Sequence, residues 1–210
     1  FPSSPPGYSV SAASVTVNVK TLVGDWRLAP MAGALSVGWD AANVWPTAGW
    51  WASTATDVDA RYCLFDDIFR FGSDGSFTNV LGSDTWLESW QGVDGDRCGA
   101  PVAPHHGGTS ATYTYDSSTG VLTLDGLGAY LGIPKPFNGG ELTNPSDAPD
   151  SITYSVTELS ESEMTVQVFI NDREYGLIIS PKDTDLNLRA VEFVEENHLN
   201  PAIAPKVETE

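Results

Sequence analysis

Short stretches of alternating or β-branched residues, separated by turn-forming residues, constrain this fold more than any other sequence feature. Val15, Val17 and Val19 alternate with polar residues, as expected of a strand with one buried face. Further expected strands span 22–29, 61–71, 76–81, 84–91, 112–115, 121–124, 152–159, 164–170 and 174–180. No helix of crossover length separates them, which disfavours a parallel sheet. We therefore expect an all-β, antiparallel barrel or barrel-like sandwich of about eight to ten strands.

Two long segments rich in glycine and proline interrupt this pattern. Residues 30–60, which carry four tryptophans, and residues 126–150 are both interpreted as long ordered loops. The ends differ again. We expect a Pro- and Ser-rich arm and strand over 1–20, one domain over 21–185, and a short helix or strand with an acidic tail over 186–210.

The charge balance excludes several classes of partner. Lys and Arg number 10 against 28 Asp and Glu, a formal net charge of −18. Such a surface repels phosphate backbones and anionic lipid headgroups, so no nucleic-acid partner is expected. No apolar run approaches the length of a membrane-spanning helix. Apolar residues make up 41% of the chain, which is enough for a core and indicates an acidic globular protein.

The two cysteines, Cys63 and Cys98, lie near strand-like segments and form no CxxC motif. A disulfide between them closes a loop of about 35 residues and stabilises the fold by about 3–4 kcal/mol in the chain-entropy model. The alternative is a pair of buried free thiols. The Gly-, Ser-, Thr- and Trp-rich composition is typical of a secreted protein, which favours the disulfide and an extracellular or outer-cell-surface location.

The expected strand 84–91 carries the clearest candidate site. Alternation places Asp84, Trp86, Glu88 and Trp90 on one face. An indole ring stacks on the C–H face of a pyranose, and a carboxylate accepts hydrogen bonds from its hydroxyls. Core packing is the competing interpretation for both tryptophans, because tryptophan is highly buried on average.

The loop 30–60 supplies a second group of aromatic side chains, namely Trp39, Trp45, Trp50 and Trp51. Loops on a rigid barrel commonly carry binding residues. Three interpretations stay open: a ligand platform, packing that anchors the loop, and a protein-contact patch. Tyr130, in the second long loop, is expected to close the same mouth of the barrel.

The carboxylates offer only a weak case for hydrolysis. A glycosidase needs two carboxylates facing each other across the bond, whereas neighbours such as Asp66 and Asp67 on a strand face opposite sides. Asp67 with Glu88 is the conceivable pair. If Glu88 is buried it needs partners, and Arg61, Arg70 or water can supply them.

Metal and cofactor signals are sparse. His105-His106 has only His198 as a further histidine and matches no zinc spacing, so we expect a solvent-facing pair. Asp94-Gly95-Asp96 and Asp57-Val58-Asp59 offer oxygen ligands but do not match the EF-hand pattern. No cofactor is expected, and structural calcium stays an open alternative.

Several motifs resemble lipocalin-like domains of secreted bacterial proteins. The run Leu22-Val23-Gly24-Asp25-Trp26-Arg27-Leu28 resembles their opening strand, L-x-G-x-W-x-L. The run Cys63-Leu64-Phe65-Asp66-Asp67, followed by Phe71 and by Asp74-Gly75-Ser76-Phe77, resembles their next hairpin. Residues 112–124 and 152–168 resemble their later meander. The resemblance covers about residues 21–180 and implies a closed antiparallel barrel.

The Trp-rich centre resembles modules attached to secreted glycan-degrading enzymes and to surface glycan-binding proteins of marine Bacteroidetes. The runs that carry this resemblance are Trp50-Trp51, 85–92, 99–105 and 128–134. It implies a role near polysaccharide and supplies no catalytic residue.

The leading hypothesis is a noncatalytic extracellular module that binds a polysaccharide or oligosaccharide. Its expected binding residues are Trp39, Trp45, Trp50, Trp51, Trp86, Glu88, Trp90 and Tyr130. One alternative is a structural subunit or spacer of a cell-surface assembly, joined to neighbouring domains or to other copies through the terminal arms. The others are an accessory domain of a glycoside hydrolase and a lipocalin-type carrier of a small apolar ligand.

Overall fold

The computed structural model describes residues 21–38, 49–160, 162–170 and 173–181, with backbone only at 49–50 and 173–181. The expected strand 14–20, the arm before it, the helix or strand after 185 and the tail lie outside the described residues. Within the described part, the chain is mainly β-sheet, which confirms the all-β expectation.

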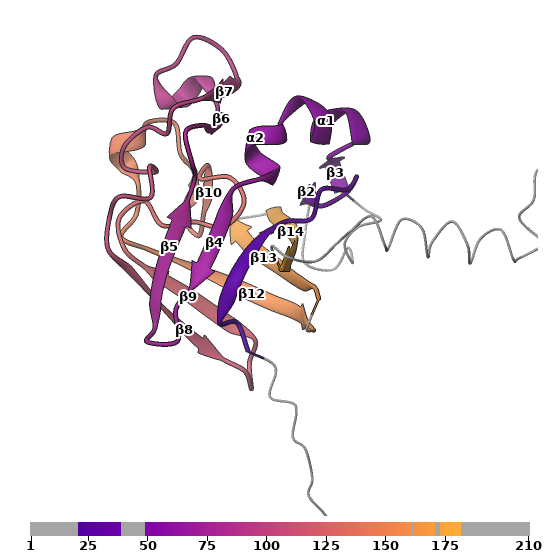
Figure 1. Ribbon diagram of the computed structural model, residues 1–210, viewed down its shortest axis with the longest axis vertical. Coiled ribbons are helices and arrows are strands. Elements are labelled where there is room, and N and C mark those ends of the chain that lie inside the picture. The colour runs from indigo at the N-terminus through magenta and orange to yellow at the C-terminus, as the bar shows by residue number, and fades with distance from the viewer. Residues whose placement is uncertain (1–20, 39–48, 161, 171–172, 182–210) are drawn as a thin grey trace, which may run out of the picture.

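Ten of the described strands form one antiparallel sheet (Figure 1). They are β1 (Gly24–Leu28), β2 (Leu35–Gly38), β3 (Gly49–Ala52), β4 (Ile68–Phe71), β5 (Ser76–Val80), β8 (Ala111–Asp116), β9 (Val121–Asp125), β12 (Ser151–Leu159), β13 (Met164–Ile170) and β14 (Arg173–Pro181). Their order is β1-β4-β5-β8-β9-β12-β13-β14-β2-β3. The sheet is curled and barrel-like, because β14 pairs with β1 as well as with β13 and β2.

Shorter elements lie at one end of the curled sheet, at the top of Figure 1. Five of them, which we call the cap, are α1 (Ala55–Ala60), α2 (Tyr62–Phe65), β6 (Thr85–Leu87), the 3-10 helix η1 (Ser89–Gln91) and β7 (Arg97–Gly99). The segment 126–150 adds the two-residue strands β10 (Pro136–Phe137) and β11 (Gly140–Glu141) and the 3-10 helix η2 (Pro145–Asp147).

The meander β8–β9–β12–β13 follows from the period-two pattern of its sequence. Ile152, Tyr154 and Val156 of β12 are buried on one face, and Leu122 and Leu124 of the neighbouring β9 are fully buried beside them. Alternation of this kind directs every second side chain into the core. The same core contains a set of large aromatic side chains, namely Trp26, Phe69, Phe71, Phe77 and Tyr154.

The hairpin β4–β5 turns at Ser73-Asp74-Gly75, residue types that indicate a turn between the expected strands 61–71 and 76–81. Gly75 has φ of +85°, a conformation that side-chain-bearing residues rarely adopt. The Asp74 carboxylate accepts hydrogen bonds from the backbone N–H and the hydroxyl of Ser76, at 3.0 and 2.6 Å. These local contacts explain why this turn can be identified from residue types alone.

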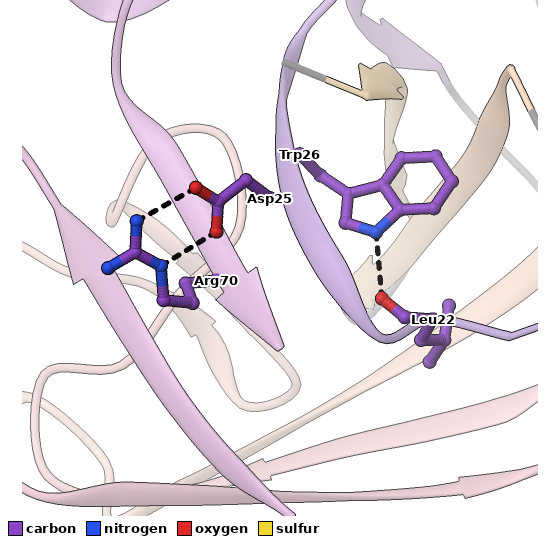
Figure 2. A network of polar contacts seen from close by, with 4 residues as sticks. All are labelled: Leu22, Asp25, Trp26 and Arg70. Carbon is purple, nitrogen blue, oxygen red and sulfur yellow. Dashed lines mark hydrogen bonds and ion pairs between the residues drawn. The ribbon is translucent and has the colours of Figure 1, made fainter. Parts of the chain in front are cut away.

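Strand β1 combines an exposed ion pair with a buried indole, as Figure 2 shows. Asp25 lies opposite Arg70 of β4, and the guanidinium donates two hydrogen bonds to its carboxylate at 2.7 and 2.8 Å. Trp26 points the other way, is 4% exposed, and donates its indole N–H to the carbonyl of Leu22 at 2.8 Å. The strand expected over 22–29 is therefore present as β1.

Three expectations for the region before residue 100 are wrong in detail. Residues 30–60 contain β2, β3 and α1 rather than loop alone, and the expected strand 61–71 begins with the helix α2. Thr54 and Asp57 explain the first helix: the Thr54 hydroxyl accepts from the Asp57 backbone, and the Asp57 carboxylate accepts from the Thr54 backbone. The expected strand 84–91 is a strand only over β6 and continues as η1.

Candidate binding cleft

The disulfide brings together the cap elements that carry the candidate site. Cys63 of α2 is bonded to Cys98 of β7, which confirms the predicted pairing. Cys98 lies opposite Trp86 in the β6–β7 hairpin, and Arg61 precedes Cys63 by two residues. A covalent link between α2 and β7 therefore places Arg61 beside Trp86.

Arg61 lies over the faces of two indole rings. Its guanidinium carbon is 4.7 Å from the ring centroid of Trp86 and 5.3 Å from that of Trp51. Both distances are within the range of cation–π attraction. Because Trp51 comes from β3, this contact joins the β2–β3 hairpin to the cap.

A cleft of about 310 Å³ opens next to this contact, and we call it the rim cleft. It is lined by Leu35, Val37, Trp51, Arg61, Glu88, Ile133 and Lys135. The three aliphatic side chains are buried and form an apolar floor, whereas the indole and the three charged side chains are half-buried. An apolar surface with a few convergent polar groups is typical of a small-molecule site.

Glu88 is held in the cleft wall by its own neighbours. Its backbone N–H donates to the side-chain oxygen of Gln91 at 2.9 Å. Its carboxylate accepts the indole N–H of Trp90 at 2.8 Å. Trp90 in turn packs edge-on against the ring of His105, with centroids 5.7 Å apart. The Glu88 carboxylate is thus fixed in position while it still lines the cleft.

Lys135 reaches the cleft from the long segment 126–150, which is tied to the sheet at several points. The Tyr130 carbonyl accepts from the Asn79 side chain at 2.8 Å, and the Leu131 backbone N–H donates to the Tyr154 hydroxyl at 3.0 Å. The Lys135 ammonium forms an ion pair with Glu141 at 3.2 Å. The opposite wall of the cleft is therefore an anchored loop.

The structure places four of the predicted binding residues in or beside the rim cleft. Trp51 and Glu88 line the cleft, Trp86 lies under Arg61, and Trp90 holds Glu88. Trp39 and Trp45 lie outside the described residues, as does the side chain of Trp50.

The prediction that Tyr130 closes the mouth of the barrel as a binding residue is wrong. The side chain is 2% exposed within the core and has no ring face for a ligand, because the segment that carries it folds down onto the sheet. Burial also raises the pKa of its hydroxyl well above the usual range.

Asp67 is sealed away from the cleft. It is 1% exposed, and its carboxyl accepts a hydrogen bond from the Thr85 hydroxyl at 2.6 Å. Burial raises its pKa from 3.8 to about 8, with the negative charges of Asp66 and Asp84 adding to the effect. The conceivable pair of Asp67 with Glu88 therefore does not face a shared space.

The paired histidines are not both solvent-facing, contrary to expectation. His106 is exposed, but His105 is 3% exposed and packs edge-on against both Trp90 and Tyr130. Burial lowers the pKa of His105 to about 4, with the neighbouring His106 charge contributing. His105 is consequently neutral at pH 7 and acts as a packing residue.

Two carboxylates considered for calcium have structural partners. Asp57 caps α1, and these hydrogen bonds from Thr54 lower its pKa. Asp96 accepts the backbone N–H of Ser89 at 2.9 Å. Both carboxylates stabilise the cap.

Arg61 and Lys135 line the cleft, and sequence reasoning did not assign either of them to the site. Arg61 was considered only as a partner for Glu88, and these two residues line the same cleft without forming an ion pair. A usable signal for Lys135 is its position between two prolines, in a lysine-poor chain. Arg61 carries no comparable local signal, because its role depends on the disulfide.

No protein-family model matches this sequence, and no curated protein matches it either. Among the helices in the described part of the chain, none has the length and apolar character needed to cross a membrane.

Proposed function

We propose that this chain is a noncatalytic glycan-binding module of lipocalin-like architecture, working outside the cell and taking a saccharide in the rim cleft. The observation that supports this proposal most directly is one cleft with an apolar floor. Its lining includes Trp51, Arg61, Glu88 and Lys135. An indole suits the C–H face of a pyranose, and charged groups of both signs suit its hydroxyls. The disulfide agrees with an oxidising compartment.

A noncatalytic role is supported by the placement of the carboxylates. Hydrolysis by the common mechanism requires two carboxylates across the scissile bond. Glu88 lines the cleft, but Asp67 is buried and bonded to Thr85. The module is therefore proposed to hold a sugar without cleaving it.

A rim site is preferred over an interior site of the kind a carrier of apolar ligands uses. Large side chains, including Phe69, Phe71 and Trp26, pack together in the core. Side chains that fill a small barrel leave little room for a ligand inside it.

Isothermal titration of the full chain against soluble β-glucans, alginate and related polysaccharides tests the proposal. We expect heat of binding together with a change in tryptophan fluorescence for at least one ligand. Trp51→Ala is expected to weaken binding by about fivefold or more, since stacking of a ring such as a nucleic-acid base on one aromatic side chain contributes about 1–3 kcal/mol. Tyr62→Ala is the matched control.

Tyr62 is an aromatic residue of the same cap, 58% exposed and not part of the cleft lining. Its removal is expected to leave binding unchanged. The proposal is wrong if the whole panel produces neither heat nor a fluorescence change, or if Trp51→Ala and Tyr62→Ala bind equally well.

A further inference from the structure

The rim cleft is lined by more basic than acidic side chains, although the chain as a whole is strongly acidic. The sequence has a net charge of −18, yet two basic side chains, Arg61 and Lys135, line the cleft with one carboxylate, Glu88. The basic side chains that the structure describes are Arg27, Arg61, Arg70, Arg97 and Lys135. Two of these five are thus gathered at one small cleft.

The hydrogen-bond donors of Arg61 are available in a way that those of Arg70 are not. Arg70 donates two hydrogen bonds to Asp25, whereas Arg61 forms no ion pair with any carboxylate in the described ranges. The guanidinium carbon of Arg61 lies over two indole rings, and its N–H groups, which form the edge of the planar guanidinium, donate no hydrogen bond within the described residues. An edge of this kind matches the oxygens of a carboxylate or a sulfate group.

The other two charged side chains of the cleft are already engaged. Lys135 is paired with Glu141, and Glu88 accepts the indole N–H of Trp90. The pairing of Lys135 leaves Arg61 as the basic side chain of the cleft lining that forms no ion pair with a described residue, although its charge also acts at longer range on Asp57, whose pKa it helps to lower. The engaged Glu88 keeps lone pairs for sugar hydroxyls.

We propose that the rim cleft selects anionic saccharides, a choice that rests on the proposed glycan-binding function. The uronate carboxylate or sulfate ester of one sugar unit accepts hydrogen bonds from Arg61. The C–H face of the same segment packs against Trp51, and Glu88 accepts from a hydroxyl. Trp86 and the disulfide act as positioning groups, because they hold the guanidinium at the edge of the cleft.

Ionic strength decides whether the contact at Arg61 can outweigh the repulsion from the rest of the chain. At about 0.15 M salt the Debye length is about 8 Å, so distant acidic residues are largely screened. A direct contact within the half-buried cleft is screened less. The selectivity is therefore expected to be stronger at physiological salt than at very low salt.

Matched ligands test the inference by isothermal titration at about 0.15 M salt. One arm compares uronate oligosaccharides with their carboxyl-reduced counterparts, and the other compares sulfated oligosaccharides with desulfated ones. The anionic member of at least one pair is expected to bind about tenfold more tightly or better, the value of a hydrogen bond to a charged group. The arm that shows the preference identifies the anion.

Substitutions at Arg61 assign the preference to its guanidinium. Arg61→Gln is expected to remove the preference while the neutral oligosaccharide still binds. Arg61→Lys is expected to retain part of it, because the charge remains and the planar edge is lost. Arg97→Gln is the control, since it removes the same charge from an exposed position on the cap outside the cleft. Circular dichroism verifies that each variant is folded.

The outcomes separate this inference from the function on which it rests. Equal binding of the neutral and anionic members of both pairs overturns the anion selectivity and leaves glycan binding intact. Absence of binding by every oligosaccharide overturns glycan binding itself. A preference that survives Arg61→Gln, or that disappears equally in Arg97→Gln, overturns the assignment to Arg61.

Discussion

The meander β8–β9–β12–β13 and the cap show two ways in which one chain encodes structure. In the meander, β8 and β9 are consecutive strands, as are β12 and β13, and alternating residues such as Ile152 and Tyr154 bury one face. In the cap, short elements from residues 55–65 and 85–99 are joined by a disulfide and by Arg61 over two indoles. The meander supplies part of the core, and the cap places Arg61 and Glu88 in the lining of the cleft.

The largest effect on stability is expected from the core side of this comparison. Phe71→Ala removes a ring that is 1% exposed and lies 5.1 Å from Phe77 and 4.9 Å from Tyr113, centroid to centroid. The free energy of unfolding should fall by about 3–5 kcal/mol, as for other buried Phe→Ala changes. Urea titration measures it. A loss below that of the exposed control Tyr62→Ala would contradict the assignment of Phe71 to the core.

Removing the disulfide tests whether the cap depends on a covalent link. The double change Cys63→Ala and Cys98→Ala should lower the free energy of unfolding by about 3–4 kcal/mol, from the added freedom of the unfolded loop. Hydrogen exchange should rise first in α1, α2 and the β6–β7 hairpin, while β12 and β13 stay protected. Equal loss of protection in both regions would remove the distinction between them.

The buried carboxyl at the base of the cap gives a dependence on pH. Asp67 titrates near 8 in the folded chain against an ordinary value of 3.8, so unfolding releases its proton between these values. The free energy of unfolding should therefore fall as pH rises from about 4 to about 8, by an amount on the order of a few kcal/mol.

Asp67→Asn isolates this contribution, because the amide oxygen still accepts from Thr85 and no longer titrates. The variant should lose less stability than the native chain between pH 4 and pH 8 in urea titrations. His105 has the opposite sign: its folded pKa of about 4 makes stability rise toward pH 6.5. His105 is present in both proteins, so its contribution cancels when the pH dependence of the variant is compared with that of the native chain. Parallel curves for the two proteins would contradict the raised pKa of Asp67.

The smallest effect is expected at the exposed ion pair of β1 and β4. The Arg70 side chain is 52% exposed, so its two hydrogen bonds to Asp25 compete with water. Arg70→Gln should shift the urea midpoint only slightly, and added salt should reduce the shift further. A shift comparable with that of the disulfide variant would show that this pair is a main support of the sheet.

The sequence alone predicts the antiparallel sheet, the turn at Gly75 and the cysteine pairing, and it singles out Trp51, Trp86, Glu88 and Trp90, which lie in or beside the rim cleft. These features depend on alternation, on local turn chemistry or on residue type. It does not predict that 62–65 is helical, that Tyr130 is buried, or that Arg61 lies at the cleft. Those outcomes depend on partners far along the chain: Cys98 for α2, Asn79 for the segment of Tyr130, and Trp86 for Arg61. Side-chain periodicity carries no information about such partners, so only the tertiary structure decides which aromatic residues form the core and which form the cleft.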